Sequence, residues 1–139
     1  MSRKAARDSA FKIIYQTPFH SEVSSPEVME LYLSDESCGK LTQSDLEYVR
    51  QIVSNCFENL ENIDNSLSSS LKNWTLERIS KVNRAILRLS LSEIRYGEIP
   101  YQVSINEAVE LAKKYSDDDA PSFVNGVLAD VISKISGDS

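Results

Sequence analysis

Apolar residues recur at three- and four-residue spacing along most of the chain, which is the pattern of helices that bury one face. The clearest stripe follows Thr42 and consists of Leu46, Val49, Val53, Cys56, Phe57 and Leu60. No polar-apolar alternation rich in β-branched residues stands between hairpin dipeptides, as the strands of a sheet would require. The pattern therefore predicts an all-α fold.

Capping and breaking residues divide this pattern into about seven helices. A residue that precedes proline is disfavoured in helical geometry, so the first helix is expected to end before Pro18. Proline suits the first turn of a helix, so Pro26 is expected just after a cap at Ser25. The predicted helices cover residues 3–16, Ser25 to the break at Cys38-Gly39, Thr42 through Leu60, residues 64–71, a cap at Thr75 through Gly97, Ser104 onward, and residue 120 onward.

The helix predicted between Thr75 and Gly97 is apolar on two faces. One stripe consists of Ile79, Val82, Ile86 and Leu89, and the other of Leu87, Leu91 and Ile94. A helix with two apolar stripes is packed on two sides, so this one is predicted to be the central helix. Gly97 is expected to end it, with Pro100 beyond as a stop.

The two helices after Pro100 carry their own signals. The run Ser104-Ile105-Asn106-Glu107 matches a capping box, in which the serine and glutamate side chains each accept a hydrogen bond from a backbone amide. Gly126 lies within the last helix, where glycine costs about 1 kcal/mol relative to alanine, so it is predicted to permit a close helix contact. That helix is predicted to bury Val124, Val127, Leu128, Val131 and Ile135.

Length and composition limit the class of protein. With 139 residues, of which 41% are hydrophobic, the chain can bury one core without metal or disulfides. We expect one domain over residues 1–139, with helical halves at about 1–62 and about 63–139. Cys38 and Cys56 lack Cys-x-x-Cys spacing and suit a reducing cytosol, with Cys56 in the core. No apolar run reaches the roughly 18 residues that cross a bilayer, so a cytoplasmic protein is predicted.

The net charge of −6 hides a basic N-terminal tip. Cations near a helix start oppose the helix dipole, and each destabilises the helix by roughly 0.3–1 kcal/mol. A bound phosphate would make the same cations favourable, because it attracts both them and the free backbone amides of the first turn. Residues 1–12 carry Arg3, Lys4, Arg7 and Lys12 against Asp8 alone. The tip is therefore either a phosphate-binding arm or a solvated terminus, and the charges alone leave both alternatives open.

Phe123 is a second candidate for binding. It lies at one edge of the apolar stripe of the last helix, where its ring would either stack on an unpaired base or pack between helices. The cations Lys81, Arg84, Arg88 and Arg95 form a sector of the central helix that is either an extension of an RNA-binding track or a solvated face.

Catalytic and metal-binding patterns are missing from the sequence. His20 is the only histidine, and no phosphate loop or Gly-x-Gly-x-x-Gly run is present. Three acids, Asp117 to Asp119, precede the last helix, where dipole and cap preferences explain them. We therefore expect no enzyme activity, no cofactor and no metal.

The stretch from Ile99 to Leu128 contains Pro100-Tyr101, the run from Ile105 to Lys113, and the run Phe123-Val124-Asn125-Gly126-Val127-Leu128. With these motifs it resembles the core of the NusB family of transcription antitermination factors. It implies two small helical bundles packed together. It also implies binding of boxA-type single-stranded RNA in rRNA operon transcripts, together with the ribosomal protein NusE, for a transcription elongation complex.

The resemblance also suggests roles for individual residues. Arg3, Lys4 and Arg7 fall on the basic positions of the family's RNA-binding arm, and Phe123 on an aromatic of its RNA surface. Tyr15, Glu77 and Asn83 fall on positions that face the protein partner, although some members have an acidic residue in place of Asn83. A homodimer stays open on this basis. The alternative function is a non-catalytic helical adaptor for other proteins without specific RNA binding.

Overall fold

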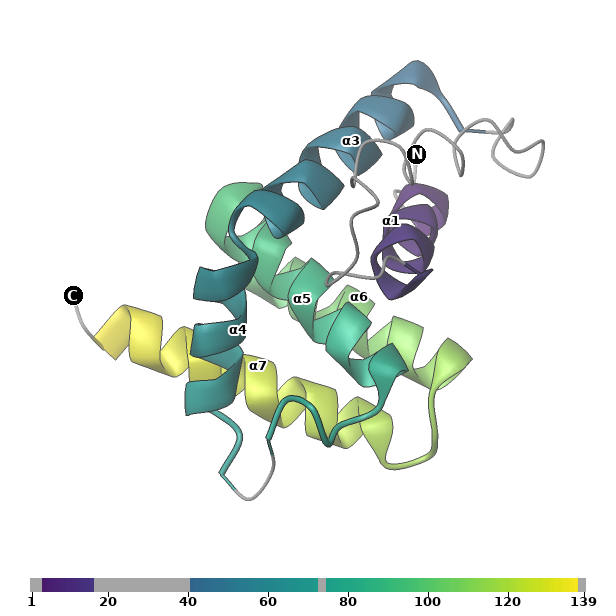
Figure 1. Cartoon of the computed structure of the whole chain (residues 1–139). Helices are drawn as coiled ribbons and strands as arrows, with labels where there is room; N and C mark the ends of the chain where they lie inside the picture. The colour runs from purple at the N-terminus through teal and green to yellow at the C-terminus, as the bar shows by residue number, and fades with distance from the viewer. Residues whose placement is uncertain (1–3, 17–40, 73–74, 138–139) are drawn as a thin grey trace.

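The computed structural model describes residues 4–16, 41–72 and 75–137, and within them six helices and no strand form the regular structure (Figure 1). The predicted all-α fold is confirmed, whereas the helix predicted from Ser25 to Cys38 lies outside the described residues. The helices are α1 (Lys4–Gln16), α3 (Gln43–Glu58), α4 (Leu60–Ser69), α5 (Lys81–Tyr96), α6 (Tyr101–Tyr115) and α7 (Ala120–Gly137).

Helix α5 is the centre of the fold and packs against each of the other five described helices. Figure 1 shows it running between α3 and α1 on one side and α6 and α7 on the other. Its leucines are almost completely buried, with Leu87 and Leu91 at 0% exposure. The two-sided packing predicted from its two apolar stripes is therefore confirmed.

Two of the predicted helix starts differ in outcome. Thr42 caps α3 as predicted, because its hydroxyl accepts a hydrogen bond from the backbone of Asp45 at 3.1 Å. The predicted start of α5 at Thr75 is wrong: residues 75–79 form a turn, and α5 begins at Lys81. Ser80 is the N-cap, since its hydroxyl accepts from the backbone N–H of Asn83 at 3.0 Å.

The predicted capping box at Ser104 is also wrong. Helix α6 begins three residues earlier, at Tyr101, because Pro100 serves as its N-cap and accepts a hydrogen bond from the backbone of Ser104 at 3.1 Å. Ser104 therefore lies within the helix at 0% exposure. Its hydroxyl is used for contacts with α5 instead of a cap.

Helix α7 differs from prediction at two positions. Val124, Val127, Leu128 and Val131 are buried, but Ile135 is 40% exposed because it lies near the end of the helix, where less of the core covers it. A Cβ added at Gly126 would meet no atom within 4 Å, so the predicted close helix contact is wrong. The close contact occurs at Gly97, the C-cap of α5, where a Cβ would lie 2.7 Å from Ile52 Cδ1.

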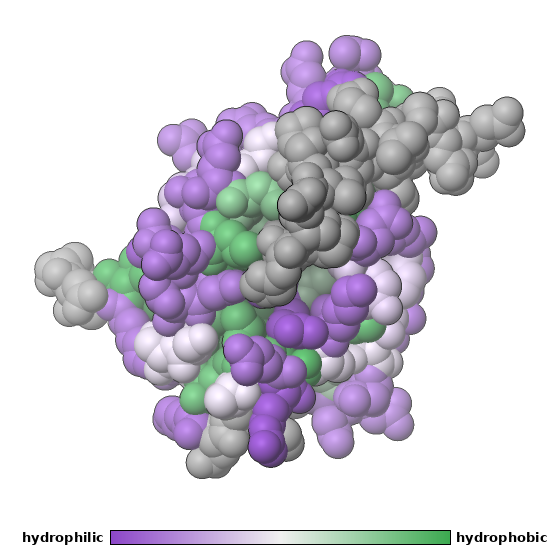
Figure 2. Space-filling view, viewed as in Figure 1, coloured by the Kyte–Doolittle hydropathy of each residue, from purple (hydrophilic) through white to green (hydrophobic). Residues whose placement is uncertain are grey.

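The described residues on the face seen in Figure 2 are mainly polar, and the hydrophobic ones show as separate areas among them. Within the described ranges, none of the helices combines the length and apolar character needed to traverse a bilayer.

Candidate nucleic-acid interface

Lys4 opens α1 and lines a cavity of about 310 Å³ between α1 and α6. The exposed lysines Lys113 and Lys114, at the C-terminal end of α6, line the same cavity together with Glu107 and Glu110. Lysines in the last turn of a helix are favoured by its dipole. The basic start of α1 and the basic end of α6 therefore share one hollow, while Arg3 lies outside the described residues.

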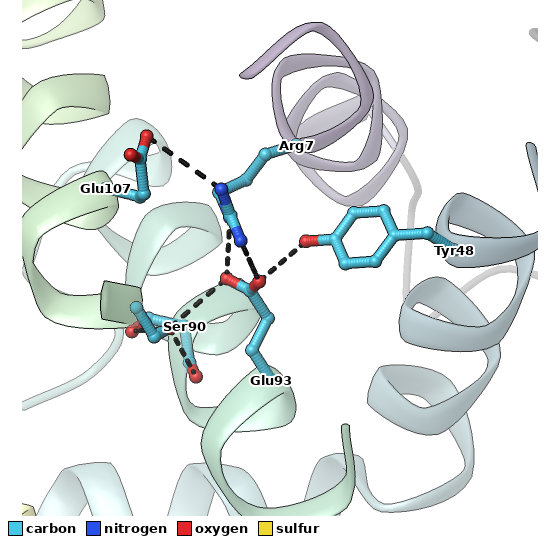
Figure 3. A network of polar contacts seen from close by, with 6 residues as sticks. Arg7, Tyr48, Ser90, Glu93 and Glu107 are labelled. Atoms are coloured by element: carbon cyan, nitrogen blue, oxygen red, sulfur yellow. Dashed lines mark hydrogen bonds and ion pairs between the residues drawn. The ribbon is translucent and has the colours of Figure 1, made fainter. Parts of the chain in front are cut away.

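Arg7 does not lie on the surface, although the sequence-based interpretation placed it at an exposed basic tip. Its side chain is 6% exposed and forms a fork with the carboxylate of Glu93 on α5, with Nη2–Oε2 at 2.8 Å and Nε–Oε2 at 2.9 Å (Figure 3). Glu107 on α6 lies 3.8 Å from Nη1. The expectation of an exposed Arg7 is wrong, because two carboxylates from other helices surround its guanidinium.

The Arg7 contact belongs to a buried network that joins four helices (Figure 3). Tyr48 on α3 donates its hydroxyl proton to Glu93 at 2.7 Å, and Ser104 on α6 donates to the same carboxylate at 3.2 Å. Burial alone would lower the pKa of Arg7, but the hydrogen bonds and charge of Glu93 raise it. Burial, followed by the charge of Glu93, raises the pKa of Tyr48, so that hydroxyl stays a donor. The network fixes α1 on the rest of the fold.

A second set of contacts joins α1 to the end of α6. The carboxylate of Asp8 accepts hydrogen bonds from the hydroxyl of Tyr115 and from Lys114 at 3.3 Å, and it pairs with Lys12 at 3.1 Å. The ring of Tyr115 stacks on Phe11 with centroids 5.0 Å apart. Burial would raise the pKa of Asp8, but these donors, Tyr115 first, lower it. Asp8 and Lys114 both line the cavity that Lys4 lines, so these contacts form part of its wall.

The partner-facing residues expected from the sequence separate into two places. Tyr15 is 38% exposed at the end of α1, and Lys81 Nζ of α5 lies 4.9 Å from its ring centroid. Glu77 is exposed in the turn before α5. Asn83 is only 8% exposed and therefore does not present its side chain on the same open surface.

Asn83 instead lines a second cavity, of about 340 Å³, together with Phe123 and the exposed Arg78. Its Oδ1 accepts a hydrogen bond from Ser116 at 2.8 Å. Phe123 is half-buried and packs on the core from the first turns of α7. The sequence-based candidates Asn83 and Phe123, 40 positions apart in the sequence, thus lie in one hollow.

The chain segment at the end of α6 links the two cavities. Lys113 and Lys114 line the first cavity, Ser116 contacts Asn83, and Asp117 lines the second. The two cavities are thereby joined by the run from Lys113 to Asp117, and Arg7 holds the helix that carries Lys4 on the rest of the fold. Sequence reasoning missed Arg78 and Ser116, because neither stands in a recognisable motif.

The basic sector predicted along α5 does not form one continuous track. Arg88 is paired with Asp64 of α4 through two hydrogen bonds of 2.9 Å, and Arg95 donates to Ser66 at 2.8 Å. Lys81 instead contacts α1, where its Nζ lies over the ring of Tyr15.

In the described part of the chain, no group of three or more His, Cys, Asp or Glu side chains could hold a metal ion.

Comparison with known proteins identifies relatives over almost the whole chain. The NusB family model matches residues 4–133. A transcription antitermination protein NusB of Ruminiclostridium cellulolyticum is 42% identical over 132 residues, which cover 94% of this chain and 88% of the relative. The corresponding protein of Acetivibrio thermocellus is 40% identical over 136 residues, covering 95% and 89%.

Solved structures agree in fold. T. maritima NusB aligns with a TM-score of 0.86 and 32% identity, covering 96% of this chain and 92% of that one. A crystal structure of the antitermination factors NusB and NusE in complex with dsRNA aligns with a TM-score of 0.84 and 28% identity, covering 95% and 96%.

Proposed function

Because the chain belongs to the NusB family, we propose that it is an RNA-binding transcription antitermination factor that holds boxA-type single-stranded RNA together with NusE. Support for RNA and NusE as partners comes from the solved complex of NusB and NusE with dsRNA, whose NusB-like fold matches this chain over nearly its full length. The elongating polymerase in the bacterial cytoplasm is then the complex on which the pair acts. The proposal includes no catalytic step.

The observation that carries the proposal is the pair of cavities joined by the end of α6. One offers exposed lysines, and the other offers an aromatic ring next to a buried amide. RNA-binding proteins that read single strands combine these features, with cations on phosphates and aromatic rings stacked on bases. Arg3, Lys4 and Phe123 are the proposed RNA-contacting residues. Arg7 has a supporting role, because its contact with Glu93 holds α1 against α5.

The proposed NusE surface is the end of α1 and the turn before α5. Tyr15 offers an exposed ring there, and Glu77 offers an exposed carboxylate. Asn83 is proposed for the RNA side instead, since it lines the cavity that also contains Phe123. Tyr15→Ala is expected to weaken NusE binding while leaving the helical content unchanged.

The function is tested by titrating a fluorescent boxA-type RNA and a scrambled RNA of equal composition, each with and without NusE. We expect tighter binding of the boxA-type sequence and a further gain when NusE is present. Equal, weak binding of both RNAs with NusE present would contradict the proposal and favour the helical adaptor.

A further inference from the structure

Gly126 is not explained by packing or by backbone geometry within the described part of the molecule. It lies inside α7, where glycine is less stable than alanine, and its φ is not positive. It is exposed, and a Cβ added there would meet no atom within 4 Å. Glycine also occurs where a ligand approaches a backbone closely, which leaves this use for Gly126.

Gly126 lines a further cavity, of about 350 Å³, between α7 and the residues that follow α4; we call it the Gly126 cavity (Figure 1). Phe123 lines the Gly126 cavity and also the cavity that contains Asn83, so its ring lies where the two meet. The exposed Lys72 belongs to the first of these cavities and the exposed Arg78 to the second. Phe123 thus adjoins two hollows, each with one exposed cation.

A side chain at position 126 would narrow the Gly126 cavity next to Phe123. Side chains on a helix lean toward its N-terminus and cover the turn before their own Cα. Such a side chain would therefore lie over Ser122 and Phe123, which line the same cavity. Because position 126 is a glycine, the ring can be approached from this side.

We propose that an RNA strand stacked on Phe123 continues over Gly126 into the Gly126 cavity, where Lys72 binds a phosphate. A nucleotide within a strand has one phosphate on its 5′ side and one on its 3′ side, and Arg78 and Lys72 offer a cation to each. Asp130 is the one carboxylate among the described residues of the Gly126 cavity. It lies one helical turn beyond Gly126, so the phosphate is expected on the Lys72 side.

The inference rests on the proposed RNA binding at Phe123 and adds the path of the strand beyond that ring. It predicts that substitutions at Gly126 change folding and RNA binding in opposite directions. Gly126→Ala is expected to raise the thermal midpoint, because alanine favours a helix and its methyl group meets no atom. Gly126→Met keeps a good helix former but places a long side chain beside Phe123.

The test measures dissociation constants for boxA-type RNA at saturating NusE. They are expected to rise from glycine to alanine to methionine, and by at least about fivefold for Gly126→Met, the lower end of the cost of one lost stacked base. Ser133→Met alters an exposed position of α7 outside the cavity, so as the matched control it should leave RNA binding unchanged.

Lys72→Ala tests the phosphate contact separately. It is expected to reduce the slope of log K against log salt by about 0.7, the value for one single-strand phosphate. Combined with Gly126→Met, it should weaken binding less than the product of the two single effects, because both act on the same part of the strand. RNAs shortened one nucleotide at a time from each end locate that part, since its removal should abolish the penalty of Gly126→Met.

Three outcomes would overturn the inference. Unchanged affinity in Gly126→Met, with the preference for boxA-type RNA retained, overturns it and leaves the proposed function intact. An equal penalty in Ser133→Met would show that bulk anywhere on α7 has the same effect. Weaker NusE binding by Gly126→Met in the absence of RNA would show that the cavity faces NusE instead. Failure of the unchanged protein to prefer boxA-type RNA overturns the proposed function, and this inference with it.

Discussion

The Arg7–Glu93 pair determines how α1 is held on the rest of the molecule. Both side chains are nearly inaccessible, at 6% and 1% exposure, and the carboxylate also accepts from Tyr48 and Ser104. A buried charge is tolerated only when it is paired and hydrogen-bonded, and the fork geometry of arginine meets that need. Loss of Arg7 leaves the Glu93 carboxylate buried without a cation, and loss of Glu93 leaves Arg7 with only the more distant Glu107 carboxylate, 3.8 Å from Nη1.

We predict that Arg7→Met lowers the free energy of unfolding by about 3–5 kcal/mol, as expected for one partner of a buried pair. The double variant Arg7→Met with Glu93→Leu is expected to cost less than the sum of the two single changes, because no lone charge remains. Urea unfolding of the four proteins measures this coupling. Additive costs would show that the two side chains do not depend on each other.

At the scale of helices, the end of α6 is attached to α1 through Asp8. Its pKa is lowered in the folded protein by the Tyr115 hydroxyl and by Lys12 and Lys114, after burial has raised it in part. A carboxyl with a lowered folded pKa stabilises the fold above its unfolded pKa, and this stability is lost as the pH falls through the folded value. The contact between these two helices is therefore acid-sensitive.

We predict that Asp8→Asn lowers the urea midpoint most near neutral pH. The difference from the unchanged protein is expected to shrink as the pH falls below about 4, the ordinary pKa of an aspartate. Asp118→Asn, which alters an exposed carboxylate in the loop after α6, is the matched control and should change the midpoint less. A constant difference from pH 7 to pH 3 would show that the charge of Asp8 does not contribute.

The start of α5 provides a separate prediction, because two candidate caps lie five residues apart. Ser80→Ala is expected to lower the free energy of unfolding by about 0.5–2 kcal/mol, since the Asn83 backbone N–H loses its acceptor. Thr75→Ala is expected to change it by less than about 0.5 kcal/mol, because Thr75 is exposed in a turn. Thermal or urea unfolding distinguishes the two, and a larger effect at Thr75 would contradict the observed helix start.

The spacing of apolar residues predicts a helix correctly where the apolar stripe begins next to an unambiguous capping residue. Helix α1, the Thr42 cap and the two-sided burial of α5 all follow from the spacing of apolar residues and from capping chemistry. The starts of α5 and α6 did not follow. Thr75 matches a cap pattern as well as Ser80, and Ser104 matches one better than Pro100, which makes no side-chain cap hydrogen bond. Local sequence cannot identify the cap when tertiary contacts, such as Ser104 with Ser90, decide.

The candidate site was predictable in type but not in arrangement. Lys4 and Phe123 stand out by charge and by position on a stripe. Arg7 shares the charge of Lys4, and only the contact with Glu93, 86 positions away, reveals that it is buried. The contact of Ser116 with Asn83 is likewise long-range and has no sequence pattern. Whether a residue is available for binding or supports the fold therefore depends on side-chain contacts between helices that are far apart in the sequence.

At the scale of the whole molecule, a net charge of −6 opposes RNA binding unless the cations that matter are concentrated at one place. Replacing any one lysine by alanine changes the net charge from −6 to −7. Lys4 and Lys113 line the first cavity, whereas Lys134 lies near the far end of α7 and pairs with Asp130. The three substitutions therefore alter total charge equally and local charge differently.

We predict that Lys4→Ala and Lys113→Ala each weaken RNA binding and reduce the slope of log K against log salt by about 0.7, the value for one lost contact with a single-strand phosphate. Lys134→Ala is expected to leave both quantities unchanged. The slopes are obtained by titrating boxA-type RNA, with NusE present, at several salt concentrations. Equal losses in all three variants would mean that RNA responds to overall charge, and the hollow between α1 and α6 would then have no special role in holding it.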